Sequence, residues 1–471
     1  MSALLLLALV GTSFPTEARR TPKPQPPTME QGAAELLSDG LESTEAWSEL
    51  RYLCDHIGHR LAGSVGLERA VAWGAEQMEA DGLVTSLEPV QVPVWIRGEE
   101  QVELLSPLPR RLEVLTLGGS VGTPPEGLSG EVMVVGSFDE LSERGAEAAG
   151  KIVLFDDPWV DYGQAVSYRG RGAVAAAEQG AIAALVRSPT PVSLGTPHTG
   201  GMRYAEDVPE IPAVAVTLED AAWMRRLIEN GETVRVGLKL GAHRGGEAPS
   251  HNVVGEVKGR EHPEQVVILA CHLDSWDVGQ GAQDDGAGCV AAMEAGRLLA
   301  AMPVAPRRTV RVVLFANEEF GLSGGKAYGA AHADELELIV AALEADTGAG
   351  QPLGFRVDMR AGDTGERDEA LTAATIAALE QYMPLLEDID VVQLESSWSG
   401  ADISPMVKKG VPGLGLMHDT EGYWPIHHTT ADTFDKVDPT LLAKNVAAMT
   451  VMGWILAEMP EPLPRWLPAG E

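Results

Sequence analysis

Hydrophobic and polar positions follow two different patterns along the chain. From about residue 29 to 86, apolar residues recur at steps of three and four, which predicts amphipathic helices ending near Gly82. From about residue 250, continuous apolar runs alternate with helical stretches; the runs are HNVVGEVKG, QVVILACH, RTVRVVLFANEE and ELIVAALEAD. Buried continuous strands that alternate with helices are typical of a mostly parallel α/β sheet.

The segment between residues 108 and 245 has a different character. Short β-rich runs such as GEVMVVG and GKIVLFDD are separated by helical pieces, and no cluster of His, Asp and Glu with ligand spacing occurs there. We predict a self-contained α/β module that is inserted into the main domain and flanks the mouth of its site. The main domain is then formed by residues 29–107 and 246–461, with a tail at 462–471.

The N-terminus has the features of an export signal. Residues 3–10 are apolar, which is the length of a signal-peptide core and too short to span a bilayer, and Thr16-Glu17-Ala18 offers a cleavage site. We predict a signal peptide at 1–18, a Pro-rich linker at 19–28, and a secreted or periplasmic protein. A cytosolic N-terminus is the alternative, because no Lys or Arg precedes the apolar run. No other run approaches the length of a membrane helix, so membrane insertion is not expected.

The composition limits the kinds of molecule that the protein is expected to bind. The 471 residues carry 69 acidic and 35 basic side chains, a net charge of −34, which argues against nucleic acid because a phosphate backbone needs a basic surface. Cys54, Cys271 and Cys289 provide neither a disulfide framework nor the paired spacing of a structural zinc site. We interpret all three as small core residues.

Polar side chains gather where the apolar runs of the main domain end. The residues concerned are His272, Asp274, Asp284, Glu318, Glu319, Asp346, and, near the C-terminus, His427 and His428. Ligands of such sheets bind outside the carboxyl ends of the strands. So many carboxylates on one face require a cation, and imidazole with carboxylate suits zinc, whereas an all-oxygen shell suits magnesium or calcium. Two zinc ions bridged by an aspartate activate water for hydrolysis.

Each of these features has an ordinary alternative when it is taken alone. A histidine that ends a strand is usually a hydrogen-bonded surface group, two adjacent glutamates are usually solvated, and two aspartates before glycine usually form a turn. Neighbouring side chains diverge, however, so that one of Glu318 and Glu319 can bind metal while the other acts as general base. The combination of these positions, and no single one of them, predicts a catalytic site.

Several stretches resemble one family, that of the co-catalytic di-zinc exopeptidases, which includes aminopeptidases and carboxypeptidases. The stretches are LCDHIGHRLAGS, HNVVGEVKG, HLDSWDVGQGAQDDGAG, NEEFGLSGG, EADTGA, GADISPMVKKGVPG and HHTTADT. The resemblance covers most of the chain, and HLDSWDVGQGAQDDGAG is its most specific part. It implies a three-layer α/β/α fold with a mostly parallel central sheet. The inserted segment resembles a protease-associated domain.

The resemblance also implies a role for each site residue and two Zn²⁺ ions as cofactors. The implied roles are: His272 and Asp346 on one zinc, Glu319 and His428 on the other, Asp284 bridging, Glu318 as general base, and Asp274 orienting His272. The family pattern H-[ST]-x-x-D-T selects His428 over His427, which packs or bonds locally. The peptide between Asp284 and Asp285 is expected to be cis. Asp402 and Ser404 either shape the floor of the site or belong to a loop.

The implied function is hydrolysis of short peptides by a zinc-dependent exopeptidase. The resemblance favours a carboxypeptidase or dipeptidase acting on unblocked dipeptides; an aminopeptidase stays open, because the metal ligands do not determine which substrate terminus is recognised. A single-zinc acyltransferase resembling glutaminyl cyclases would not need the second set of ligands. A non-catalytic relative resembling the transferrin receptor would lack ligands that are present here. The family also implies a homodimer.

Overall fold

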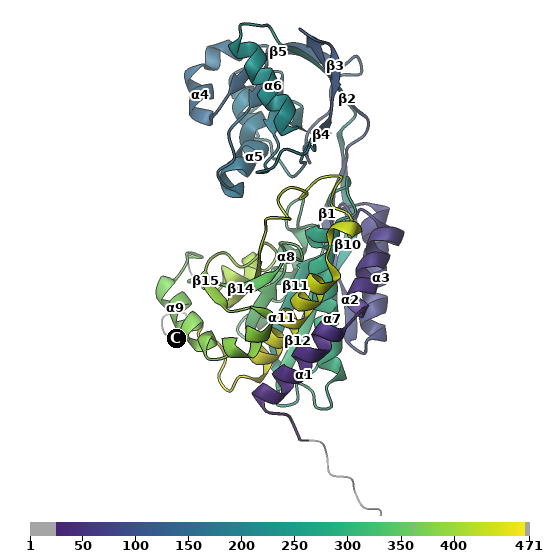
Figure 1. The fold of residues 1–471 in the computed structure, drawn as a ribbon, viewed down its shortest axis with the longest axis vertical. Helices are drawn as coiled ribbons and strands as arrows, with labels where there is room; N and C mark the ends of the chain where they lie inside the picture. Colours follow the sequence, from purple (N-terminus) through teal and green to yellow (C-terminus); the bar gives the residue numbers. More distant parts are fainter. Residues whose placement is uncertain (1–24, 363, 467–471) are drawn as a thin grey trace, which may run out of the picture.

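The computed structural model describes residues 25–362 and 364–466, so the predicted signal peptide and most of the predicted linker lie outside the described residues. Two eight-stranded sheets organise the chain (Figure 1). The main sheet has the order β1 (Val84–Ile96), β10 (His243–Val257), β12 (Arg308–Phe315), β11 (His262–His272), β13 (Ile339–Glu344), β16 (Gly413–His418), β14 (Pro352–Asp358) and β15 (Gln393–Ser396).

Helices cover both faces of the main sheet, which confirms the α/β/α prediction. Alternate residues of β11 show this, because Leu269 and Cys271 pack into one core and Ile268 and Ala270 into the other. One face carries α1 (Met29–Glu42), α2 (Glu45–Tyr52), α3 (Val65–Ala80), α7 (Ala287–Ala301) and α11 (Pro439–Glu458). The other face carries α8 (Ser323–Ala331) and α10 (Ser404–Val407), while α9 (Glu369–Glu380) packs beside β14 and β15. The central pairs β12–β11, β11–β13 and β13–β16 are parallel.

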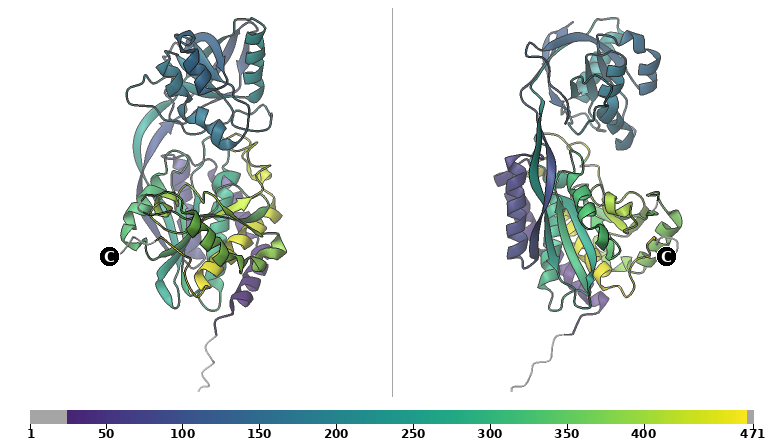
Figure 2. Two further views of the ribbon diagram at one scale, coloured as in Figure 1. Left: turned by 90° about the vertical axis from the view of Figure 1, so that its left-hand side faces the viewer. Right: turned by 180° about the vertical axis from the view of Figure 1, so that it is seen from behind.

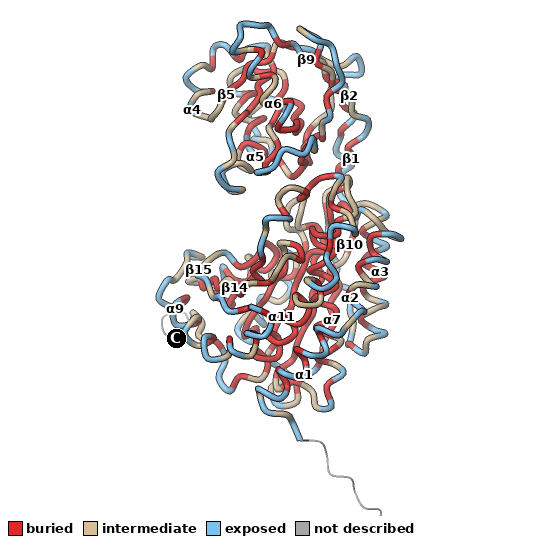
Figure 3. The backbone as a smooth tube through the Cα atoms, viewed as in Figure 1, coloured by how far each residue is buried: buried red, intermediate tan, exposed pale blue. Residues whose placement is uncertain are grey.

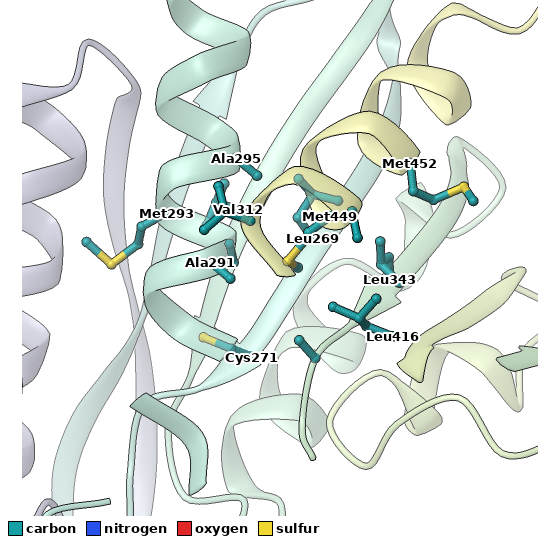
Figure 4. Close-up of a cluster of buried hydrophobic side chains, with 14 of the residues drawn as sticks. Leu269, Cys271, Ala291, Met293, Ala295, Val312, Leu343, Leu416, Met449 and Met452 are labelled. Carbon is teal, nitrogen blue, oxygen red and sulfur yellow. The ribbon is translucent and has the colours of Figure 1, made fainter. Parts of the chain in front are cut away.

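Local sequence explains where two of the helices begin or end. Thr28 caps α1 through a reciprocal capping box with Gln31, and the chain leaves α3 through Gly82, whose φ of +88° few other residues tolerate. Helix α11 is the one described helix that is long and apolar enough to cross a membrane, and 78% of its most apolar window is buried inside the fold. The expectation that no second run reaches this length is therefore wrong. The apolarity of α11 serves the core, where Met449 lies beside Leu269 and Met452 belongs to the same cluster (Figure 4).

The second sheet lies in the inserted segment. Its order is β3 (Arg110–Leu112), β2 (Glu100–Ser106), β9 (Arg235–Leu240), β5 (Leu128–Val135), β6 (Ile152–Phe155), β7 (Ala183–Arg187), β8 (Ala213–Val216) and β4 (Val114–Thr116). Helices α4 (Phe138–Glu143), α5 (Tyr162–Glu178) and α6 (Leu218–Glu229) complete it. We call residues 100–240 the inserted module and the rest of the described chain the main domain. The module has hydrophobic cores of its own (Figure 3).

The boundaries of the module and of the tail differ from the prediction. Strand β2 was expected in the main domain, but it belongs to the second sheet, because β3 and β9 lie on either side of it and satisfy its backbone hydrogen bonds. The long strands β1 and β10 form an antiparallel ladder that carries the module above the main domain (Figure 2). The predicted tail begins too early, since Leu463 is buried in the main core and Arg465 donates to main-chain carbonyls after α8.

The interpretation of the cysteines needs one correction. Cys271 at the end of β11 and Cys289 in the first turn of α7 form a disulfide, with Cα atoms 5.0 Å apart. Helix α7 packs directly on the face of β11 to which Cys271 points, and this brings the two thiols together. Cys54 is a buried free thiol, as predicted.

Candidate active site

Three adjacent parallel strands bring the predicted residues to one edge of the main sheet. His272 is the last residue of β11, Glu318 and Glu319 follow β12, and Asp346 follows β13. The pairing aligns His272 with Phe315 and Ala270 with Glu344, so the polar residues leave the sheet at the same level. Asp284 enters from the loop before α7.

The five predicted metal ligands form a single cluster in which Asp284 is central. Each Asp284 oxygen faces a different histidine: Oδ1 lies 3.3 Å from His272 Nε2, and Oδ2 lies 3.2 Å from His428 Nε2. His272 Nε2 also lies 3.1 Å from Asp346 Oδ1, and His428 Nε2 lies 2.9 Å from Glu319 Oε2. Two groups of side chains are each compact enough to hold a metal ion: His272 with Asp284 and Asp346, and Asp284 with His427 and His428.

His427 also approaches this cluster. Its ring stacks on His428 with centroids 3.6 Å apart, and its Nε2 lies 3.6 Å from Asp284 Oδ2. Its Nδ1 is buried without a hydrogen-bond partner, and burial next to His428 lowers the pKa of His427 well below its usual range. His428 is the closer of the two to Asp284 and the only one within 4.0 Å of Glu319.

Asp274 holds the site together in a way that differs in detail from the expectation. Its carboxylate accepts hydrogen bonds from the main-chain N–H groups of Glu318 (2.9 Å) and Glu319 (3.3 Å). Its distance to His272 Nδ1 is 3.8 Å, whereas the main-chain oxygen of Asp274 lies 3.1 Å from that nitrogen. Asp274 therefore contacts His272 chiefly through its backbone and fixes the Glu318–Glu319 turn through its side chain.

Two buried residues that were not singled out from the sequence shape the loop containing Asp284. Asp432 accepts hydrogen bonds from three successive main-chain N–H groups, those of Ala282, Gln283 and Asp284. Arg60 donates to the carbonyls of Leu273, Gln280 and Gly281. Both lie in motifs that carry the family resemblance, HHTTADT and LCDHIGHRLAGS, which was the available signal. The expected cis peptide between Asp284 and Asp285 is present.

The ionisable groups of the cluster perturb one another strongly. Burial, together with the carboxylates of Asp346 and Glu319, raises the pKa of Glu318 well above its usual range. Burial and the charge of Asp284 raise the pKa of Glu319 to about 7. Burial lowers the pKa of His428, but Glu319 and Asp284 outweigh this and raise it to about 9. Strongly shifted pKa values of this kind are typical of sites where buried carboxylates and imidazoles lie close together.

The cluster faces a cleft of about 1290 Å³ that both parts of the chain line. The main domain contributes Glu318 and Trp424, and helix α5 of the inserted module contributes Tyr162 and Arg169. Tyr162 stacks on Trp424 with ring centroids 4.5 Å apart. The module therefore forms one wall of the cleft, consistent with the view that places α5 above the main domain (Figure 1).

Arg169 is the notable residue of this wall. Its side chain is only 8% exposed, and it donates to Tyr162 Oη (3.0 Å) and to the Thr199 carbonyl (3.3 Å). Its Nη1 also lies 3.1 Å from Nδ1 of His428. Its Nε has no hydrogen-bond partner, and no carboxylate of the described residues lies within ion-pair distance of it. Gly200, with φ of +138°, packs against the guanidinium, where a Cβ would lie 2.3 Å from Cζ. Sequence reasoning missed Arg169 because a single arginine in a helix looks like a solvated charge.

Comparisons with known proteins agree with this site. The model of "Peptidase family M28" matches residues 252–452, which contain all five predicted ligands. Carboxypeptidase Q of Xenopus laevis is 41% identical over 92% of this chain and 90% of its own length. Human carboxypeptidase Q is 39% identical over 90% of this chain and 88% of its own length.

Solved structures show the same relationship. The peptidase M28 precursor from Shewanella amazonensis superposes with a TM-score of 0.88 at 35% identity, over 93% of this chain and 99% of that one. A zinc aminopeptidase from Bacillus subtilis shares the fold at 21% identity, with a TM-score of 0.65 over 91% of this chain and 98% of that one. We conclude that the chain belongs to peptidase family M28 and is a metallopeptidase similar to carboxypeptidase Q.

Proposed function

We propose that the protein is an exported, zinc-dependent exopeptidase that acts on short peptides as a carboxypeptidase or dipeptidase. Two zinc ions are its cofactors. His272 and Asp346 hold one ion, Glu319 and His428 hold the other, and Asp284 bridges them. Residues 1–18 act as the signal peptide, the two sheets define two domains, and the protein forms a homodimer.

The chemistry of the donors supports zinc at this position. Imidazole nitrogens and carboxylate oxygens in equal measure on each side of Asp284 match the ligands that zinc prefers in hydrolases. Asp284 Oδ2 and Glu319 Oε1 are buried and have no hydrogen-bond partner, as expected of atoms that bind a cation. When bound, a zinc pair polarises the scissile carbonyl and lowers the pKa of water.

Glu318 is the general base of the proposed reaction. It lines the cleft beside the cluster, and no ion pair or side-chain hydrogen bond within the described chain engages its carboxylate. It accepts the proton of the attacking water and delivers it to the leaving amine. Asp274 acts as a positioning residue, because its carboxylate holds the main chain of both glutamates.

The observation that carries the carboxypeptidase reading is the buried, incompletely paired guanidinium of Arg169. A cation held in the wall of a cleft without a carboxylate of its own is suited to a carboxylate of the substrate. A free α-carboxylate is the anion that every unblocked dipeptide offers. Recognition of this group distinguishes a carboxypeptidase or dipeptidase from an aminopeptidase.

An aminopeptidase remains the second candidate because carboxylates also line the cleft. Asp139 and Glu178 of the inserted module lie on the same wall, where they can receive a free substrate amine. Both carboxylates are exposed, whereas Arg169 is buried.

Three substrates decide between these functions. Purified zinc-loaded protein is given a free dipeptide, its N-acetylated form and its C-terminal amide, and products are followed by mass spectrometry. Cleavage of the free dipeptide but not of the amide supports the proposal. Cleavage of the amide but not of the acetylated form establishes the aminopeptidase instead. Absence of any cleavage with two zinc ions bound shows that the substrate class is wrong.

A further inference from the structure

The two histidines of the cluster are held by different parts of the molecule. A metal-binding imidazole uses one nitrogen for the metal and usually donates from the other to a carbonyl or carboxylate. For His272 the acceptor is the main-chain oxygen of Asp274, in the loop that follows the same strand. For His428 two groups of the inserted module face Nδ1, the Thr199 carbonyl at 3.2 Å and Arg169 Nη1 at 3.1 Å. An arginine can only donate, so when Nε2 holds a metal ion the Thr199 carbonyl is the acceptor for the Nδ1–H of His428.

A second contact strengthens the link between Thr199 and His428. The main-chain N–H of Thr199 donates to the main-chain oxygen of His428 at 3.0 Å. The two residues thus exchange hydrogen bonds across the boundary between module and main domain. Both are buried, and His428 adopts a φ of +62°, a conformation that non-glycine residues rarely keep unless their surroundings impose it.

Arg97 connects this contact to the main domain. It directly follows β1, where the chain crosses into the module, and its side chain is 9% exposed. One end of the guanidinium contacts the Thr199 hydroxyl (3.3 Å) and the Thr116 carbonyl, both in the module. The other edge pairs with the carboxylate of Asp277, with Nε 2.9 Å from Oδ2. Asp277 lies five residues after His272, in the main domain.

We propose that Arg97 is a positioning residue for the metal centre, because it joins Asp277 to Thr199 and so keeps the Thr199 carbonyl against His428. The planar fork of an arginine can bind a carboxylate on one edge and acceptors on the other, which a lysine cannot do. The pair is nearly buried, and without Asp277 the remaining ion-pair partner of Arg97 is Glu100 of the module, 3.6 Å away, so the link from this arginine to the main domain is lost. The inserted module is on this view a structural part of one zinc site and not of the other.

This inference rests on the proposed function, since it concerns a zinc site formed by His428. The experiment compares the wild-type protein with Arg97→Gln and Asp277→Asn. Zinc affinity is measured by competition with a chelator, and protection of the Thr199 amide by hydrogen exchange. The control is Arg187→Gln, which breaks an ion pair with Asp156 that lies wholly inside the module.

We expect the zinc ion held by Glu319 and His428 to bind 10–100-fold more weakly in both test variants. This is about the effect of losing an outer hydrogen-bond partner of a zinc ligand. The zinc ion held by His272 and Asp346 should bind as in the wild type, and the Thr199 amide should exchange faster. The control variant should have the zinc affinity and the exchange rate of the wild type. Equal weakening of both zinc ions, or unchanged affinity in both test variants, overturns the inference. If Arg97→Gln does not fold, Asp277→Asn, which keeps the arginine, still decides. Failure of the wild type to bind zinc would refute the proposed function instead.

Discussion

The main sheet and the sheet of the inserted module have a similar architecture, but they differ in how the carboxylates at their strand ends are paired. Both have eight strands with a parallel centre and apolar strand runs. At the end of β6 in the module, Asp156 is neutralised by Arg187 and Arg225. At the ends of β11, β12 and β13, the carboxylates meet histidines and one another, and no arginine or lysine among the described residues forms an ion pair with the five predicted ligands.

The comparison shows how the pairing of buried carboxylates distinguishes a binding site from a purely structural region. Buried carboxylates need a counter-charge, and a protein that supplies its own has made a structural pair. Where the counter-charge is left out, a cation must provide it. The module reverses the situation, since Arg169 is a buried cation without a carboxylate. We therefore expect the catalytic groups in the main domain and a substrate-recognition group in the inserted module.

The largest expected effect tests where the chemistry lies. Glu318→Gln removes the proposed general base and should lower turnover by a factor of about 10²–10⁴, with the same zinc content as the wild type. Asp156→Asn is the matched change at a strand end of the module, and it should leave the turnover of the folded protein unchanged. The measurements are kcat and zinc content of each variant. Near-normal turnover in Glu318→Gln would remove this residue as the base.

The next effect tests where recognition lies. Arg169→Met should lower kcat/KM for a free dipeptide about 10–100-fold, the value of a charged hydrogen bond of about 1.5–3 kcal/mol. The already poor rate with the C-terminal amide should not change. Arg171→Met, which alters an exposed residue of the same wall, provides the control. An equal loss on both substrates would mean that Arg169 acts through His428 and not on the substrate carboxylate.

A smaller effect tests whether the two domains are stabilised separately. The disulfide closes a loop with a sequence separation of 18 residues. Replacing Cys271 and Cys289 together by alanine should destabilise the main domain by about 3 kcal/mol, and the unfolding of the module should not change. Hydrogen exchange resolved by segment measures both. A reductant should shift the wild type and not the double variant; the same shift in both would show that the disulfide does not form.

The smallest effect concerns pH and lies far from the cleft. Burial, with the charges of Asp81 and Glu294 nearby, raises the pKa of Glu49 to about 8. A carboxyl whose pKa is raised on folding contributes stability that is complete below its unfolded pKa of about 4.5 and is lost as pH rises through 8. Glu49→Gln should therefore raise the Tm of the main domain at pH 8.5 relative to the wild type, and less so at pH 5. An equal shift at both values would contradict this.

Much of the fold and of the metal cluster is determined locally and can be inferred from sequence. Thr28, Gly82 and the apolar run of β11 set the start of a helix, the end of a helix and a buried strand through short-range preferences. The five predicted ligands follow buried strands or lie in distinctive motifs. Since parallel neighbours end at one edge, position along the chain translates into position in space for His272, Glu319 and Asp346.

Other features depend on contacts between distant segments, which only the tertiary structure decided. The pairing of β2 with β9 moved the module boundary to Glu100, and the packing of α7 on β11 joined Cys271 to Cys289. Arg169 and Thr199 carry no local signal, because their importance comes from lying beside His428, more than 200 residues away. Sequence thus determined which groups end each strand, whereas the three-dimensional fold determined which groups lie opposite them, since burial and hydrogen bonding depend on distance in space.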